Sequence, residues 1–110
     1  MSQQEMREPT FLILSSLAGG SQHGYSIMQD IESLSDGRVA MRAGTLYAAL
    51  DRLVGEGLIK DAGTEVVEGR LRRYYEITNH GAGKLEEEVV RLRANASRAA
   101  SRLRAREAEA

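Results

Sequence analysis

Apolar side chains recur every three or four residues in three segments of the first half of the chain, a spacing typical of helices with one buried face. The segments are residues 9–18, residues 22–34 and a third that ends at Gly57. Their apolar stripes are Phe11, Ile13, Leu14 and Leu17; Ile27, Ile31 and Leu34; and Leu46, Ala49, Leu50, Leu53 and Val54. Ser21 is the expected N-cap of the second helix, and residues 38–41 are expected to form a short strand before the third.

The pattern changes to a period of two after the third helix. A short strand is predicted to end at Gly63, and Gly69 can supply the positive φ that a tight turn needs. In the next strand, alternation places Leu71, Arg73, Tyr75 and Ile77 on one side and Arg72, Tyr74 and Glu76 on the other. A lone hairpin is marginally stable, so this one is expected to pack on the preceding helices.

The last part of the chain carries a heptad repeat of apolar and small residues. Its members are Leu85, Val89, Leu92, Ala96, Ala99 and Leu103, separated alternately by four and three positions. Thr78 is the expected cap of this helix. Because the repeat runs beyond what a domain of this size can cover, it predicts a homodimer held together by the C-terminal helices, with Glu and Arg residues on the outer face.

Three helices followed by a two-stranded hairpin is the element order of a winged helix-turn-helix. The sequence therefore predicts a mainly α fold with a small β-hairpin. Residues 1–78 are expected to form a winged helix-turn-helix DNA-binding domain, and residues 79–110 a long C-terminal dimerisation helix. In this architecture the third helix enters the major groove of DNA and the hairpin, or wing, lies beside it.

The distribution of charge favours nucleic-acid binding more than the total does. The 110 residues carry a formal net charge of −1, whereas nucleic-acid-binding domains often have a strong basic excess. Arg70, Arg72 and Arg73 nevertheless gather where the wing is expected. We expect these arginines to contact phosphates or the minor groove, with Arg72 and Arg73 on opposite faces of the strand.

Polar residues around the start of the third helix are further candidates for DNA contact. Arg42 precedes the helix, and Thr45 lies off its apolar stripe. Tyr47 could meet DNA or pack half-buried. Arg52 could meet DNA or remain a surface charge paired with Glu56, four residues further on.

The residue types present argue against an enzyme. Cysteine is absent, and the chain has no HExxH, P-loop or GxGxxG motif. His23 and His80 do not have the spacing of metal ligands, so His23 is expected to cap or pack locally, and residues 86–88 are expected to be a charged helix face. No cofactor or metal is expected. The apolar runs are too short to span a bilayer, and we expect a cytoplasmic protein without a membrane partner.

Four blocks of the sequence resemble the PadR family of bacterial transcriptional regulators: they are HGYSIMQDIE, GTLYAALDRLVGEGLI, GRLRRYYEIT and TNHGAGKL. The family often has proline where this chain has Ala48. The resemblance implies homodimers, usually repressors, that bind palindromic operator DNA, and many release it when a small molecule binds near the dimer interface. It also implies that Tyr25, Thr45, Tyr47 and the wing arginines occupy positions that meet DNA, although Tyr25 could instead be a core residue.

We therefore expect a sequence-specific DNA-binding transcriptional regulator, a homodimeric repressor that a small-molecule effector releases from double-stranded operator DNA. A winged helix can also present its third helix to a protein. The near-zero net charge favours that alternative, a protein-interaction module without specific DNA binding. A ligand sensor with little DNA affinity is the remaining alternative, but Phe11 is the only phenylalanine and tryptophan is absent.

Overall fold

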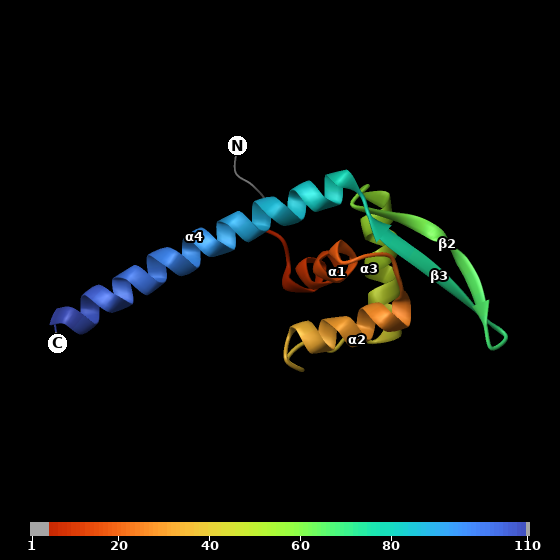
Figure 1. Ribbon diagram of the computed structural model, residues 1–110, viewed down its shortest axis with the longest axis horizontal. Helices are drawn as coiled ribbons and strands as arrows, with labels where there is room; N and C mark the ends of the chain where they lie inside the picture. The colour runs from red at the N-terminus through yellow and green to blue at the C-terminus, as the bar shows by residue number, and fades with distance from the viewer. Residues whose placement is uncertain (1–4, 110) are drawn as a thin grey trace.

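The computed structural model describes residues 5–109, which form four helices and a three-stranded antiparallel sheet. The helices are α1 (Glu8–Ala18), α2 (Gly24–Leu34), α3 (Ala43–Gly55) and α4 (Asn79–Glu109), and the strands are β1 (Gln22–His23), β2 (Ile59–Val67) and β3 (Arg70–Ile77). The hairpin of β2 and β3, called the wing below, extends from one side of the helices, and α4 projects from the other (Figure 1). The predicted winged helix-turn-helix with a long C-terminal helix is confirmed. Within the described residues, no helix is both long and apolar enough to cross a membrane.

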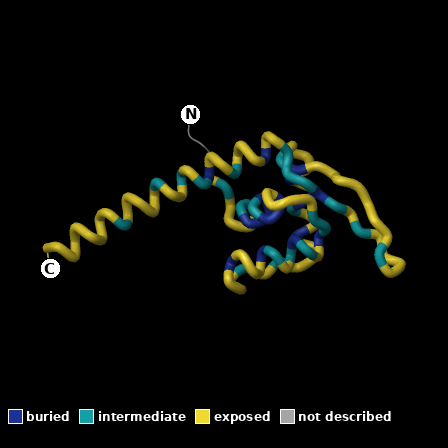
Figure 2. The backbone as a smooth tube through the Cα atoms, viewed as in Figure 1, coloured by how far each residue is buried: buried dark blue, intermediate teal, exposed yellow. Residues whose placement is uncertain are grey.

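The hydrophobic core lies where α1, α2, α3 and the base of the wing meet (Figure 2). Helix α1 is buried on most sides because it packs against α2, α4 and β3. The core side chains are Leu12, Ile13, Leu14, Leu17, Ile27, Ile31, Leu46, Leu50, Leu53, Ile59 and Tyr75. Each contributes roughly 1.5–3 kcal/mol by leaving water. The stripe predicted for α3 is thus confirmed at its three leucines, whereas Val54 is exposed.

The short strand lies before α2 and not after it. Residues 38–41, where we expected a strand, pair with no other strand, and β1 instead pairs antiparallel with β3. Because β1 belongs to the sheet, α2 begins only at Gly24. Its N-cap is therefore His23, whose ring accepts a hydrogen bond from the Ser26 N–H at 3.4 Å, and the expectation of Ser21 was wrong.

The wing is longer than the sequence pattern predicts. Strand β2 does not end at Gly63 but continues to Val67, because a shift in register between Asp61 and Thr64 accommodates the glycine as an irregularity within the strand. Glu68 and Gly69 make the reversal, both with positive φ, as in the type I′ turns that suit the twist of hairpins. The outer half of the wing consequently projects away from the helices (Figure 1).

Helix α4 is fixed to the domain at its start. The Thr78 hydroxyl accepts a hydrogen bond from the Gly81 N–H at 3.0 Å and donates one to the Gly57 carbonyl oxygen at 2.6 Å, which confirms Thr78 as the cap. Leu85 packs against the core. Beyond Val89 the heptad positions are largely exposed: Leu92 keeps 41% of its surface and Leu103 59%.

Glu88 does not belong to an exposed acidic face, as predicted for residues 86–88. Its side chain is only 7% exposed and accepts hydrogen bonds from the Arg91 guanidinium and the Met6 N–H. These partners, Arg91 first, lower the pKa of the Glu88 carboxyl although burial opposes them. Arg91 also lies 3.7 Å from the Glu5 carboxylate, so the segment that precedes α1 is held against α4.

Two glycines of α4 should respond oppositely to alanine. A Cβ at Gly81 would overlap the carbonyl oxygen of Leu58, whereas a Cβ at Gly83 meets nothing. Gly81→Ala should therefore lower the free energy of unfolding by about 1–3 kcal/mol. Gly83→Ala should raise it by up to about 1 kcal/mol, since alanine favours helix. Urea unfolding at one protein concentration measures both, and equal effects would contradict the close approach of α4 to Leu58.

Candidate nucleic-acid interface

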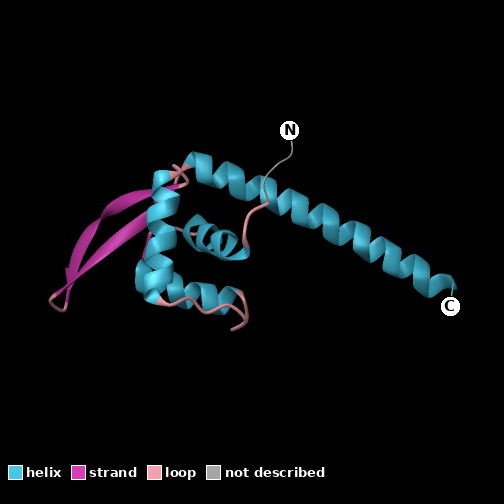
Figure 3. Ribbon diagram, turned by 180° about the vertical axis from the view of Figure 1, so that it is seen from behind, coloured by secondary structure: helices cyan, strands magenta, loops and turns pink. Residues whose placement is uncertain are grey.

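The start of α2, the start of α3 and the outer half of the wing lie at the same end of the molecule (Figure 3). The body of α4 points away from this end. The candidate residues other than Arg52 lie on these three segments. The arrangement leaves α3 accessible along the side that faces away from the core, with the wing beside it.

The first turn of α3 presents backbone and small side chains. Arg42 precedes the helix without making a side-chain cap, and the exposed Ala43 and Gly44 follow it. The unpaired N–H groups of a helix start attract anions such as phosphates. Thr45 is also exposed and lies off the buried stripe, as expected. This end of α3 can therefore approach a DNA backbone closely.

The two candidate tyrosines lie side by side across α2 and α3. The Tyr47 hydroxyl packs directly over Gly24, where a Cβ would overlap it, and 45% of the Tyr47 surface remains exposed. Tyr25 is 59% exposed and its hydroxyl accepts a hydrogen bond from the Gln29 amide at 3.3 Å, so it is not a core residue. Tyr47 combines the packing and the surface position that its sequence left open.

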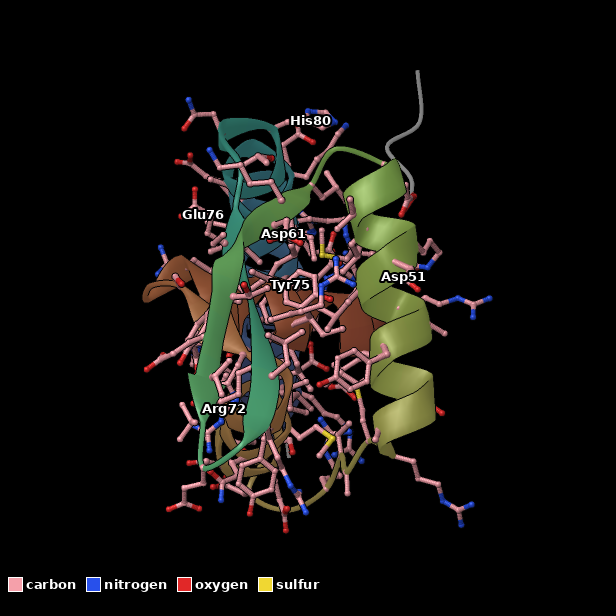
Figure 4. The ribbon with its side chains drawn as sticks, turned by 90° about the vertical axis from the view of Figure 1, so that its right-hand side faces the viewer. Asp51, Asp61, Arg72, Tyr75, Glu76 and His80 are labelled. Carbon is pink, nitrogen blue, oxygen red and sulfur yellow. The ribbon has the colours of Figure 1, made fainter. Side chains whose placement is uncertain are left out.

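Arg73 lies on the face of the wing that looks toward α3. Its guanidinium donates to the Asp61 carboxylate at 2.8 Å and lies 5.8 Å from the centre of the Tyr75 ring. The hydrogen bonds from Arg73 and from the Gly63 N–H lower the pKa of Asp61. Figure 4 shows Asp61 and Tyr75 between the strands and α3. The charge of Arg73 is thus partly balanced, a contact that no sequence spacing indicated because it crosses the irregularity in β2.

Arg70 and Arg72 lie on the other face of the wing, as alternation predicted. Neither makes an ion pair with any residue that the structure describes. Arg70 is exposed beside the turn, and an Arg72 nitrogen lies 3.5 Å from a ring nitrogen of His23. These two arginines are the cations of the wing that remain available to an anionic partner.

His23 anchors the inner end of this face. Its ring packs edge-on against Tyr74 with centroids 5.5 Å apart, and its Nε2 lies 2.8 Å from the Ser26 hydroxyl. The Tyr74 hydroxyl donates to Glu65 at 2.8 Å. Burial, followed by the positive charge of Arg72, lowers the pKa of His23. The expected local capping role of His23 is confirmed.

Arg52 lies apart from the other candidates. Its guanidinium donates to the Thr10 hydroxyl at 3.0 Å and pairs with Glu56 at 2.8 Å, so the predicted ion pair is confirmed. It lines a groove between α1, α3 and α4 together with His80 and Lys84. In the described part of the chain, no group of three acidic or histidine side chains could hold a metal ion.

A three-helix core, an exposed third helix and a wing with free arginines define the class of winged helix-turn-helix DNA-binding proteins. Within that class, the family model described as the PadR-like transcriptional regulator family matches residues 13–87. The chain belongs to the PadR family. It is accordingly a DNA-binding transcriptional regulator and not an enzyme.

Similar proteins support the assignment. An uncharacterized protein of Lysinibacillus sphaericus is 32% identical over 78 residues, which cover 71% of this chain and 72% of that protein. The crystal structure of a PadR family regulator from Clostridium difficile R20291 is 28% identical, with a TM-score of 0.71 over 86% of this chain and 96% of that chain. Bacillus subtilis PadR, solved in complex with operator DNA, is 22% identical, with a TM-score of 0.68 over 76% of this chain and 48% of that one, and shares the fold.

Mildly acidic pH should weaken the fold through His23. Because its folded-state pKa lies below the unfolded value of about 6.5, the unfolded chain binds more protons there. Stability is then fully present above that pH and is lost as the pH falls from it toward the folded-state pKa. His23→Gln should flatten this part of the profile of unfolding free energy against pH. His80→Gln, at the chain's other histidine, is the matched control, and an equal flattening by it would refute the assignment.

Proposed function

We propose that this PadR-family chain is a homodimeric repressor that works in the cytoplasm, binds a specific double-stranded operator and leaves it when a small-molecule effector binds. The observation that carries the proposal is the exposed start of α3 lying at the same end of the molecule as Arg70 and Arg72, which have no acidic partner among the described residues. The operator complex of Bacillus subtilis PadR, a protein of the same fold, supports it.

In this proposal α3 enters the major groove with Thr45 and Arg42 toward phosphates and base edges. The hydroxyls of Tyr25 and Tyr47 hydrogen-bond phosphates beside them. Arg70 and Arg72 neutralise the backbone next to the groove, and Arg73 reaches it from the other face of the wing. Arg52 can contribute only by giving up its bonds to Thr10 and Glu56.

The remaining proposal for the chain's organisation divides it into residues 1–78, which bind DNA, and residues 79–110, which hold two copies together. The exposed Leu92 and Leu103 support this division, because an apolar row on a projecting helix gains stability when a second helix covers it. Residues 86–88 are acidic and residues 98–106 carry four arginines without an acidic residue. Antiparallel helices would place these opposite charges together, so we propose antiparallel pairing.

The heptad row can be tested by charge insertion. Leu92→Glu with Leu103→Glu should convert the dimer to a monomer at micromolar concentration, since burying unpaired carboxylates is costly. Ser101→Glu, on the opposite side of α4, should leave the dimer intact. Sedimentation equilibrium measures both. A dimer that survives the double substitution would show that another surface pairs the copies.

DNA binding can be tested through its salt dependence. Arg70→Gln with Arg72→Gln should weaken binding to a duplex selected from a random-sequence library and lower the slope of log affinity against log salt by about one per lost phosphate contact. Arg38→Gln is the matched control, because Arg38 pairs with Glu8 on α1. Fluorescence anisotropy at several salt concentrations measures both. An unchanged slope would favour the protein-interaction module that the net charge of −1 suggests.

The groove that contains Arg52, His80 and Lys84 is our candidate place for the effector. It lies between the DNA-binding domain and the base of α4, so a ligand there could change the angle between the two domains of a dimer. A ligand shifts such an equilibrium only if it binds one arrangement better. Compounds that raise the melting temperature of the protein should therefore also displace the selected duplex, and compounds that do so equally well in the presence of Lys84→Glu would argue against this groove.

A further inference from the structure

The most exposed large apolar side chains of the described residues form a pair on the outer half of the wing. Val66 keeps 69% of its surface in contact with solvent and Leu71 keeps 66%. The two residues are direct cross-strand partners, so their side chains share one face of the hairpin. Neither belongs to the core or packs against it. The fold gives no reason for two apolar residues at this place.

The pair continues the face of the wing that looks toward α3. Alternation along β3 places Leu71 on the same side as Arg73 and Tyr75, and Tyr75 is buried between the sheet and α3 (Figure 4). Moving outward from Tyr75, this face passes Arg73 and ends in the apolar pair. Val66 and Leu71 thus belong to the same continuous surface as the exposed side of α3.

The opposite face of the same part of the wing is basic. Val67 and Arg70 form the next cross-strand pair and point away from α3, as do Glu65 and Arg72. Glu65 accepts a hydrogen bond from Tyr74, while Arg70 has no acidic partner in the part of the chain that the structure describes. The outer wing therefore combines an apolar face toward α3 with arginines behind it.

We propose that Val66 and Leu71 contact the deoxyribose edges that form the wall of the DNA minor groove beside the segment read by α3. This rests on the DNA-binding function proposed above and adds two residues to it. The minor groove is about 6 Å wide and lined by sugar C–H groups with phosphates at its rims, which matches an apolar face backed by arginines. Glu68 at the turn opposes entry to the floor of the groove, so the contact is with the wall, without insertion between bases.

The test compares Val66→Ser with Leu71→Ser, as a double variant, with Leu34→Ser. Leu34 is the matched control because it is 51% exposed at the end of α2, far from the wing. The DNA is a duplex recovered with the unmodified protein from a random-sequence library. The double variant should bind it about tenfold more weakly, the effect of losing roughly two buried methylene groups. Its salt slope should stay unchanged, because no charge is removed.

Footprinting locates the contact. Hydroxyl radicals attack deoxyribose from the minor groove, so the double variant should lose protection of the sugars next to the α3 site, measured at saturating protein. Methylation of guanine N7, which reports the major groove, should remain protected. Circular dichroism melting checks that the wing variants stay folded, which their exposure favours.

Each outcome is decisive. Failure of the unmodified protein to select any duplex would overturn both the proposed function and this contact. If the unmodified protein binds and the double variant matches it in affinity and sugar protection, the contact alone is refuted, and the apolar pair serves a protein partner or none. A lower salt slope in the double variant would also refute it, since an apolar contact releases no counterions.

Discussion

The burial of Tyr75 links the wing to the helical core. Strand β3 is the central strand of the sheet and hydrogen-bonds to β1 on one edge and β2 on the other, so its backbone cannot shift without breaking both ladders. Tyr75 extends from this strand into the core and keeps only 1% of its surface exposed. Burial raises the pKa of its hydroxyl, which stays neutral. The angle between the wing and α3, and hence the spacing of any two contacts with DNA, follows from this one side chain and its strand.

The inner and outer halves of the wing obey different constraints. Near Tyr75 and Ile59 each inward position is set by packing, because the core is dense and tolerates little change in volume. Beyond Arg73 the strands leave the helices, and neither face is covered. Side chains there cost little stability whatever their type, so their chemistry is free to suit a partner. The pairing of an apolar face with a basic one occurs only in this outer part.

The sequence predicted the elements that repeat and missed those set by single long-range contacts. Helical stripes identified α1, α2 and α3, and alternation identified β3. Strand β1 has only two residues and therefore no period, and its partner lies about fifty positions away in β3. Gly63 looked like a strand end because its irregular pairing depends on β3. Likewise, the partners of Glu88 and Arg52 lie on α1 and the segment before it, and nothing in their own neighbourhoods revealed them.

The same long-range pairs explain how a chain with a net charge of −1 can present a basic surface. Many acidic side chains are already matched: Glu8 with Arg38, Glu56 with Arg52, Glu76 with Lys60 and Glu88 with Arg91. An ion pair has little field at distances beyond its own size, and salt screens what remains over about 10 Å. The attraction felt by a phosphate near the wing tip is therefore set by the few charges close to it, Arg70 and Arg72 against Glu68. Total charge averages over pairs that an approaching duplex never senses, and it is a poor guide to binding for a domain whose charges are so unevenly matched.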